Sequence, residues 1–334
     1  MIQKYYKNTS WLLAERIVRL CISFIAGVYV VRYLGAEAYG KFAYALTFVA
    51  LFSAISSLGL DSIVVRNLVN NPENRDKLLG TAFWLKIFGV LISWIIIALV
   101  SMFMNNNNEI NAFIIILAFA FIFQCFNVID YNFQSQVKSV YVVQAYFLQT
   151  IVSLIIRITL VKIEASLMYF VLIVILEMFI IAFVLVINYY IKIGSPFTWR
   201  WSTSCAKNLL NDSWPLILSG VSITIYMQID QIMIKEMLGF EELGHYAVAV
   251  RLSELWYFIP IAITTSFFPA ILEAKTQNIY LYRDRMQKLY DILVVLAVMI
   301  AIPITFFGDE IILYIFGKAS LEAASALVIH IWAA

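Results

Sequence analysis

The chain has 334 residues, of which 63% are hydrophobic and 13% are charged, with a formal net charge of +2 and a mean hydropathy of +0.88. Soluble domains contain roughly 45–50% apolar and about 25% charged residues, so this composition excludes a soluble globular protein. Nucleic acid is not expected as a partner. Apolar runs of about 20 residues recur along almost the whole chain, which predicts an all-α, polytopic transmembrane helical bundle.

The hydropathy pattern predicts a series of long helices in chain order. They are expected at residues 11–33, 38–66, 79–103, 110–134, 140–162, 166–191, 212–238, 245–273, 288–307 and from about 320 onward. Residues 192–211 are polar and form the longest predicted connection. We therefore divide the chain into an N-terminal six-helix bundle, residues 1–195, and a C-terminal bundle, residues 196–334, with about four helices. Because the sequence stops inside an apolar run, the second bundle is expected to be incomplete.

A short motif occurs twice along the chain. Its copies, Leu34 to Ala45 and Leu238 to Ala249, share the pattern L-G-x-E-x-x-G-x-x-A-x-A. Each copy joins two predicted helices and the copies lie six helices apart, so we expect two parallel six-helix repeats, the second truncated, as in some transporters. The motif is expected to be architectural, with Gly in a close turn, Glu at the positive end of the next helix and small Ala residues where helices approach.

The distribution of Lys and Arg predicts the orientation of the helices. If the N-terminus is cytoplasmic, the connections and adjoining helix ends on that side hold most of the Lys and Arg residues near the ends of the predicted helices. The opposite connections hold less, namely Arg32, Lys41, Lys162, Lys235 and Lys318. Since cytoplasmic loops carry an excess of Lys and Arg, we expect a multi-pass membrane protein with a cytoplasmic N-terminus.

Several segments occur in the order and at the separation found in one family of membrane proteins. They are Ala14-Glu15-Arg16, Val30 to Gly40, Gly59-Leu60-Asp61, Trp214-Pro215-Leu216, Ile225 to Gln231, Arg251-Leu252-Ser253-Glu254 and Phe267-Phe268-Pro269. On these residues the chain resembles the bacterial polysaccharide flippases of the O-antigen and teichuronic acid type. These proteins belong to the multidrug/oligosaccharidyl-lipid/polysaccharide exporter superfamily.

The resemblance implies two helical bundles around a central cavity in the bacterial inner membrane. It also implies a flippase for polysaccharide and lipopolysaccharide biosynthesis. The substrate would be an undecaprenyl-diphosphate-linked oligosaccharide, an O-antigen or capsule repeat unit, moved to the outer leaflet by alternating access. The implied partners are this lipid-linked oligosaccharide, membrane lipids, a polysaccharide polymerase and a chain-length regulator.

Two arginines in the first predicted helix are candidates for binding the substrate. An ionisable side chain inside a bilayer costs roughly 2.5–3.5 kcal/mol on insertion scales, so it needs a partner, a wet cavity or a path to the interface. Arg16 and Arg19 are suited to a diphosphate because a guanidinium group binds two phosphate oxygens at once. Glu15 precedes Arg19 by one helical turn, so a structural ion pair is the alternative, and snorkelling to the interface is another.

Three more charged residues lie inside predicted helices of the first half. Lys86 and Arg157 are further substrate-binding candidates, with snorkelling or an interhelical ion pair as the alternative. Glu177 lies near the middle of an otherwise apolar helix, which makes it a candidate for ion coupling or gating. Its alternative is a Glu that is hydrogen-bonded to a neighbouring helix for structural reasons.

The second half contributes three candidates at the predicted outer side. Arg251 is a substrate-binding candidate, and Asp230 and Glu254 are candidates for gating. Arg251 and Glu254 are spaced i,i+3 and can pair on one helix, while Asp230 can pair with Arg251 across two helices. Breaking and reforming such pairs would open and close an outer gate.

No motif for a metal site, a phosphate-binding loop or a nucleophile with its base occurs in the sequence, and the predicted loops are short. We therefore expect no enzyme, no catalytic or metal-binding residue and no cofactor, with H+ or Na+ as a candidate coupling ion. One alternative is an ion-coupled multidrug exporter of the same superfamily, which would use an accessible, isolated acidic residue. The other is a membrane-embedded glycosyltransferase or polymerase, which would need a large outer loop.

Overall fold

The computed structural model of the chain describes residues 2–104 and 106–333, with side chains described from Glu15 onward except at Pro269 and Gln277. Every regular element within these residues is a helix. In this described part of the chain, eight helical stretches are long and apolar enough to cross a membrane: Glu15–Ala50, Pro72–Phe103, Asn108–Ser135, Val140–Lys162, Leu167–Lys192, Thr203–Leu238, Phe240–Thr276 and Ile279–Phe316. The predicted all-α, polytopic membrane bundle is thus confirmed.

The chain forms two compact units. Unit 1 contains Met1–Tyr33 and Lys41–Gly239, and unit 2 contains Leu34–Gly40 and Phe240–Ala334. The first seven residues of the first motif copy, Leu34–Gly40, therefore belong to unit 2, which also contains the second copy from Phe240 onward. The bundle boundary expected at residue 195 and the pair of six-helix repeats stay predictions.

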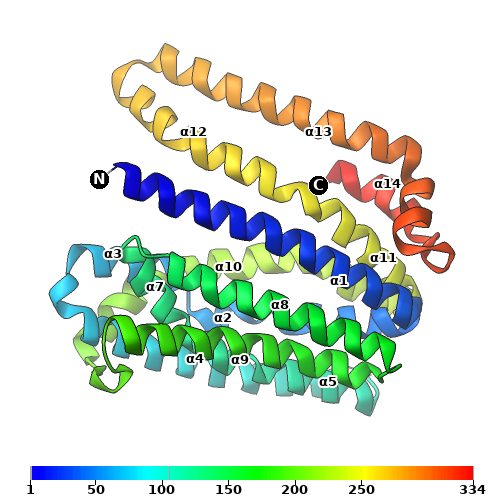
Figure 1. The fold of residues 1–334 in the computed structure, drawn as a ribbon, viewed down its shortest axis with the longest axis horizontal. Coiled ribbons are helices and arrows are strands. Elements are labelled where there is room, and N and C mark those ends of the chain that lie inside the picture. Colours follow the sequence, from blue (N-terminus) through cyan, green and yellow to red (C-terminus); the bar gives the residue numbers. More distant parts are fainter. Residues whose placement is uncertain (1, 105, 334) are drawn as a thin grey trace. The chain divides into compact units, whose positions relative to one another are not determined.

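Unit 1 is a bundle of helices around an apolar core. Its elements are most of α1 (Ile2–Ala50), α2 (Ser53–Ser57), α3 (Asp61–Asn70), α4 (Arg75–Phe103), α5 (Asn108–Phe119), α6 (Phe121–Gln124), α7 (Val128–Ser135), α8 (Val140–Lys162), α9 (Leu167–Lys192) and α10 (Thr203–Leu238). Helices α8 and α9 run side by side (Figure 1). The core packs Leu79, Phe133, Leu185 and Leu209, each fully buried, from α4, α7, α9 and α10. Inside a bilayer such side chains hold the helices together through close van der Waals packing.

Two helices that the sequence predicts as continuous are broken. The stretch predicted at 38–66 is divided among the end of α1 at Ala50, α2 and α3. The break between α2 and α3 arises because Leu58 and Gly59 both adopt positive φ, 53° and 60°. The stretch predicted at 110–134 is divided by the 3₁₀ turn η2 (Cys125–Asn127). These breaks bring Asp61 to the first turn of α3, where the positive end of the helix favours a carboxylate.

The polar segment after α9 is shorter than predicted. Helix α10 begins at Thr203 rather than near residue 212, so its polar first turns are helical and the connection ends at Ser202. The backbone N–H of Arg200 donates to the carbonyl of Asp76 at 3.1 Å, and that of Ser202 donates to Thr81 Oγ1 at 3.1 Å. A Cβ atom at Gly80 would meet the backbone of Arg200. This close contact with α4 holds the connection in place.

Unit 2 contains the remaining helices. They are α11 (Phe240–Ser253), the 3₁₀ turn η4 (Glu254–Tyr257), α12 (Phe258–Gln277), α13 (Ile279–Phe316) and α14 (Ala323–Ala333). Helices α12 and α13 form a hairpin (Figure 1), and α14 packs on α11 and α13 through the fully buried Leu243, Ala249, Ile312 and Leu327. Helix α13 begins at Ile279, before the predicted start at 288, because the charged turn around Arg283 and Arg285 is also helical. Its backbone leaves the helical conformation at Phe307, which agrees with the predicted end at 307, and helix resumes as far as Phe316.

The two motif copies contact each other within unit 2. A Cβ atom at Gly40 would overlap the carbonyl group of Phe240, and one at Gly244 would overlap the carbonyl group of Ala36. Gly40 and Gly244 are the equivalent glycines of the two copies, and Ala36 and Phe240 are equivalent as well. The contact is therefore reciprocal. It confirms that these glycines have an architectural role, since only a hydrogen in place of a side chain lets the backbones approach this closely.

Candidate functional site

A buried polar network lies in unit 1 among α3, α4 and α7. The Lys86 ammonium group donates to the Tyr131 hydroxyl at 2.6 Å and to Asp61 Oδ1 at 3.3 Å. The Tyr131 hydroxyl donates in turn to Asp61 Oδ1, and Lys86 Nζ lies 4.8 Å from the centroid of the Tyr131 ring. Lys86 is a sequence-predicted site residue, and the structure shows that it is paired with an acid on another helix.

The network joins a buried cation to an accessible carboxylate. The Lys86 side chain is 4% exposed, whereas that of Asp61 is 61% exposed. Asp130, one residue before Tyr131, accepts a hydrogen bond from Gln134 at 3.0 Å. The structure pairs Asp61 with Lys86, and Arg66 with Asp212 of α10.

The predicted arginines of α1 differ in their surroundings. Arg19 Nε lies 2.9 Å from Glu15 Oε1, and its guanidinium carbon lies 4.5 Å from the centroid of the Tyr146 ring on α8. The contact with Glu15 is ionic only, because that oxygen has no well-aligned hydrogen bond among the described residues. Arg16 is exposed. The structure thus contains the Glu15–Arg19 pair and leaves Arg16 accessible.

The position of these arginines along α1 also differs from the prediction. The helix begins at Ile2 rather than near residue 11. Arg19 therefore lies about 26 Å from the first helical residue, at 1.5 Å per residue, instead of about 12 Å.

A second charged cluster joins α8 and α9. Arg157 Nη2 donates to Glu177 Oε1 at 2.7 Å, and Arg157 Nε donates to the same oxygen at 3.2 Å. The Ser153 hydroxyl also donates to that oxygen. Both charged side chains are 15% exposed. Two predicted site residues with different expected roles are therefore bonded to each other.

The end of α10 carries a further buried cation. Lys235 Nζ donates to Asn106 Oδ1 at 2.8 Å and to Glu236 Oε1 at 2.7 Å, and it lies 4.8 Å from the centroid of the Tyr44 ring. The predicted gating residue Asp230 accepts a hydrogen bond from the backbone N–H of Gln231 at 2.8 Å. Like most of the other candidate residues, Asp230 belongs to unit 1.

The remaining two candidates belong to unit 2. Arg251 lies in the last turn of α11, and Glu254 begins the turn η4 that follows it. Both are partly exposed. Two histidines in this unit have close partners, since His245 Nε2 lies 3.3 Å from Glu322 Oε2 and His330 Nδ1 lies 2.6 Å from the Ser253 hydroxyl.

Sequence reasoning missed the tyrosines that contact the charged residues. Tyr131 and Tyr146 carry no charge and fit the apolar pattern of their helices, so hydropathy gives no signal for them. A buried Tyr hydroxyl needs a hydrogen-bond partner, which is the one rule that could have drawn attention to it. Within the described residues, no group of three or more His, Cys, Asp or Glu side chains is close enough to hold a metal ion.

The fold is similar to that of solved membrane transporters. An inward-facing multidrug resistance MATE family transporter of the MOP superfamily aligns with a TM-score of 0.74 and 14% identity, over 94% of this chain and 76% of that one. A MATE in complex with MaL6 aligns with a TM-score of 0.65 and 14% identity, over 98% and 77%. At such identities the likeness shows the fold alone. The protein therefore has the fold of a helical membrane transporter.

The sequence itself places the chain in a family. Residues 5–275 match the family described as "Polysaccharide biosynthesis protein", which covers most of the chain. The chain belongs to this polysaccharide biosynthesis family, as the resemblance in its sequence predicted. No curated protein matches the sequence significantly. The family, the fold and the long apolar helices agree on a multi-pass membrane protein of polysaccharide biosynthesis with a transporter-like fold.

Proposed function

We propose that the protein is a flippase that moves an undecaprenyl-diphosphate-linked oligosaccharide across the bacterial inner membrane by alternating access. The single observation that supports this most is the combination of a polysaccharide biosynthesis family match over residues 5–275 with a MATE-like transporter fold. A lipid-linked sugar is too polar to cross a bilayer unaided. A transporter in polysaccharide biosynthesis would supply that step.

The diphosphate is assigned to the basic residues of unit 1. Arg16 is exposed, Arg19 is partly exposed beside Tyr146, and Lys86 is tied to the accessible Asp61. A diphosphate approaching Asp61 could replace it as the partner of Lys86, because phosphate oxygens are strong acceptors for a charged donor. Arg157 and Glu177 bond to each other, so in this proposal they act as a unit that links α8 to α9.

The remaining candidates take the roles of coupling and gating. An H+ or Na+ ion would bind at a carboxylate whose pairing changes during transport, and Asp61 and Glu177 are both paired with a cation. Asp230, Arg251 and Glu254 would act at the outer gate. The N-terminus is assigned to the cytoplasm on the distribution of Lys and Arg. A polysaccharide polymerase and a chain-length regulator would receive the product.

The test is flipping in proteoliposomes. Vesicles with the purified protein would hold a fluorescent undecaprenyl-diphosphate-linked oligosaccharide, and an impermeant glycosidase added outside would cleave only the glycans that reach the outer leaflet. We expect Arg16→Met and Lys86→Met each to slow flipping about tenfold or more, since a hydrogen bond to a charged group contributes about 1.5–3 kcal/mol. Lys138→Met is the matched control, because Lys138 is an exposed Lys outside the network.

The outcomes separate the parts of the proposal. Wild-type protein that fails to speed cleavage would contradict the flippase function itself. Flipping at the wild-type rate in both Arg16→Met and Lys86→Met would leave the function standing but remove the phosphate role of these residues. Lys86→Arg, which keeps the charge, should retain most of the activity.

A multidrug exporter is the second candidate, because the solved structures of similar fold include a multidrug resistance transporter. A drug site of this kind would use an accessible, isolated carboxylate. Asp61 is accessible, but it is bonded to Lys86 and Tyr131, which weighs against the drug role. Ethidium uptake into the same proteoliposomes, abolished by Asp61→Asn, would favour the exporter over the flippase.

A further inference from the structure

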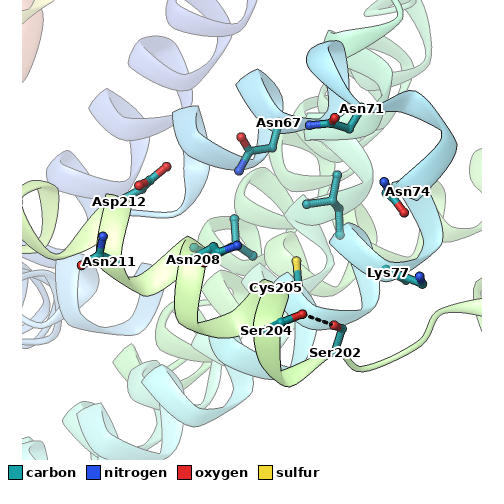
Figure 2. Close-up of a pocket in the computed structure, with 12 residues that line it drawn as sticks. Asn67, Asn71, Asn74, Lys77, Ser202, Ser204, Cys205, Asn208, Asn211 and Asp212 are labelled. Atoms are coloured by element: carbon teal, nitrogen blue, oxygen red, sulfur yellow. Dashed lines mark hydrogen bonds between the residues drawn. The ribbon is translucent and has the colours of Figure 1, made fainter.

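A polar cavity of about 530 Å³ opens in unit 1 between α3, the start of α4 and the start of α10. Figure 2 shows amide side chains on both sides of it. Those on one side are Asn67, Asn71 and Asn74, and those on the other are Asn208 and Asn211. The volume falls within the roughly 300–1,000 Å³ of sites for small ligands.

The amides form two rows with the same spacing. Asn67, Asn71 and Asn74 are separated by four and three residues along α3 and the 3₁₀ turn η1 (Pro72–Asn74). Ser204, Asn208 and Asn211 are separated by four and three residues along α10. In α10 this spacing places the row on one face of the helix. The other row follows the end of α3 into the turn η1. Because α3 and α10 are in contact, the two rows face each other across the cavity.

The amide groups are available to a ligand. Within the described part of the chain, the side-chain amides of Asn67, Asn71, Asn208 and Asn211 make no hydrogen bond to a protein group. Asn74 donates only to the neighbouring Glu73, at 3.3 Å.

Few of the side chains that line the cavity are charged. Asp212, which lines the cavity, is paired with Arg66, and Lys77 is the one cation among the described residues that line it. The cavity is thus rich in groups that both donate and accept hydrogen bonds, and poor in net charge.

This chemistry selects a neutral ligand with many hydroxyl groups. A hydroxyl donates one hydrogen bond and accepts others, and an Asn amide has two donor hydrogens and an acceptor oxygen, so the two match. A phosphate only accepts, and would be better served by several Lys or Arg side chains than by amide oxygens, which would repel it.

We propose that this cavity binds neutral sugar units of a glycan. The inference rests on the proposed flippase function, because the sugars would be those of the lipid-linked oligosaccharide. The cavity lies at the end of unit 1 where α3 ends and α4 and α10 begin, which is the end that the distribution of Lys and Arg assigns to the cytoplasm. It would hold the glycan before translocation, while the basic residues Arg16, Arg19 and Lys86 bind the diphosphate.

The test measures binding of two neutral trisaccharides, maltotriose and triacetylchitotriose, to the full chain in lipid nanodiscs free of sugar detergents. We expect slower hydrogen–deuterium exchange at residues 67–78 and 202–212 when either sugar is present, with inorganic pyrophosphate causing no such change. The double variant Asn71→Ala with Asn208→Ala should bind the sugar about tenfold more weakly or worse, because it removes hydrogen-bonding groups from both sides of the cavity.

Two further variants keep the result interpretable. Asn70→Ala is the matched control, since Asn70 is an exposed amide next to the row that does not line the cavity, and it should bind as the wild type does. Asn71→Asp with Asn208→Asp keeps the side-chain shape but removes the donors, and should also weaken binding. Its folding can be checked by thermal unfolding.

Each outcome bears on a separate claim. Unchanged sugar binding in both double variants, or protection by pyrophosphate in place of the trisaccharides, would overturn the sugar site. Sugar binding that depends on Asn71 and Asn208 in a protein that flips no lipid-linked oligosaccharide would support the site while contradicting the proposed flippase function.

Discussion

The ion pair between Arg157 and Glu177 offers the sharpest test of how charge is accommodated in this bundle. Both side chains are 15% exposed, and the two Arg157 nitrogens lie 2.7 and 3.2 Å from one carboxylate oxygen. At 2.7 Å the direct Coulomb attraction is about 6 kcal/mol for an effective dielectric constant near 20. The cost of removing both groups from water offsets much of that attraction.

Removing one partner of the ion pair should therefore lower the free energy of unfolding more than removing both partners. Arg157→Met or Glu177→Leu alone leaves a buried charge without its partner, which destabilises proteins by about 3–5 kcal/mol. The double variant removes both charges and should lie within about 1 kcal/mol of the wild type, since two apolar side chains of similar volume replace them. The expected coupling energy between the two sites is thus about 5 kcal/mol or more, the sum of the two single losses minus the loss in the double variant.

The assay is a double-mutant cycle on the free energy of unfolding. Unfolding in mixed micelles by increasing SDS, followed by tryptophan fluorescence, would give the four stabilities, and flipping would be measured on the same proteins. Additive single effects, with a coupling energy near zero, would refute the reasoning from the geometry. A stable double variant that has lost flipping would show that the pair acts in transport as well as in packing.

Two simpler substitutions test the packing of the two units. Gly244→Ala should destabilise unit 2 by about 3 kcal/mol or more, because the new methyl group would overlap the backbone of Ala36 and backbone yields less than a flexible side chain; the midpoint of SDS unfolding measures this, and an unchanged midpoint would contradict the contact. Tyr33→Phe removes the hydrogen bond from the Tyr33 hydroxyl to the Ala165 carbonyl, 2.9 Å long, and should cost only about 1 kcal/mol by the same measurement. A loss of several kcal/mol there would mean that this hydroxyl does more than the structure shows.

The membrane class and the order of the long helices could be predicted because they depend on runs of apolar residues. The predicted helices at 140–162 and 166–191 agree with α8 and α9 within a residue. The start of α10 could not be predicted, because its first turns are polar and hydropathy reads them as loop. The break between α2 and α3 was also missed, since Leu58 adopts a positive φ that side-chain pattern alone does not signal.

The charged residues of the candidate site could be predicted from the sequence, but most of the side chains that they contact could not. Arg19, Lys86, Arg157 and Glu177 stood out because charge inside an apolar run is costly. Their partners were not evident, apart from Glu15, which lies one turn from Arg19 on the same helix. The aromatic contacts were not evident either, because Tyr131 and Tyr146 are compatible with an apolar helix face.

The sequence by itself determined that this protein spans a membrane, where its long helices lie, and that a glycine motif recurs at two turns. Those properties depend on local composition and on residues close together in the chain. Only the tertiary structure decided that Lys86 meets Asp61, that Arg157 meets Glu177, and that Gly40 and Gly244 lie against each other's motif. Such contacts depend on the rotation and register of packed helices, which no local pattern specifies.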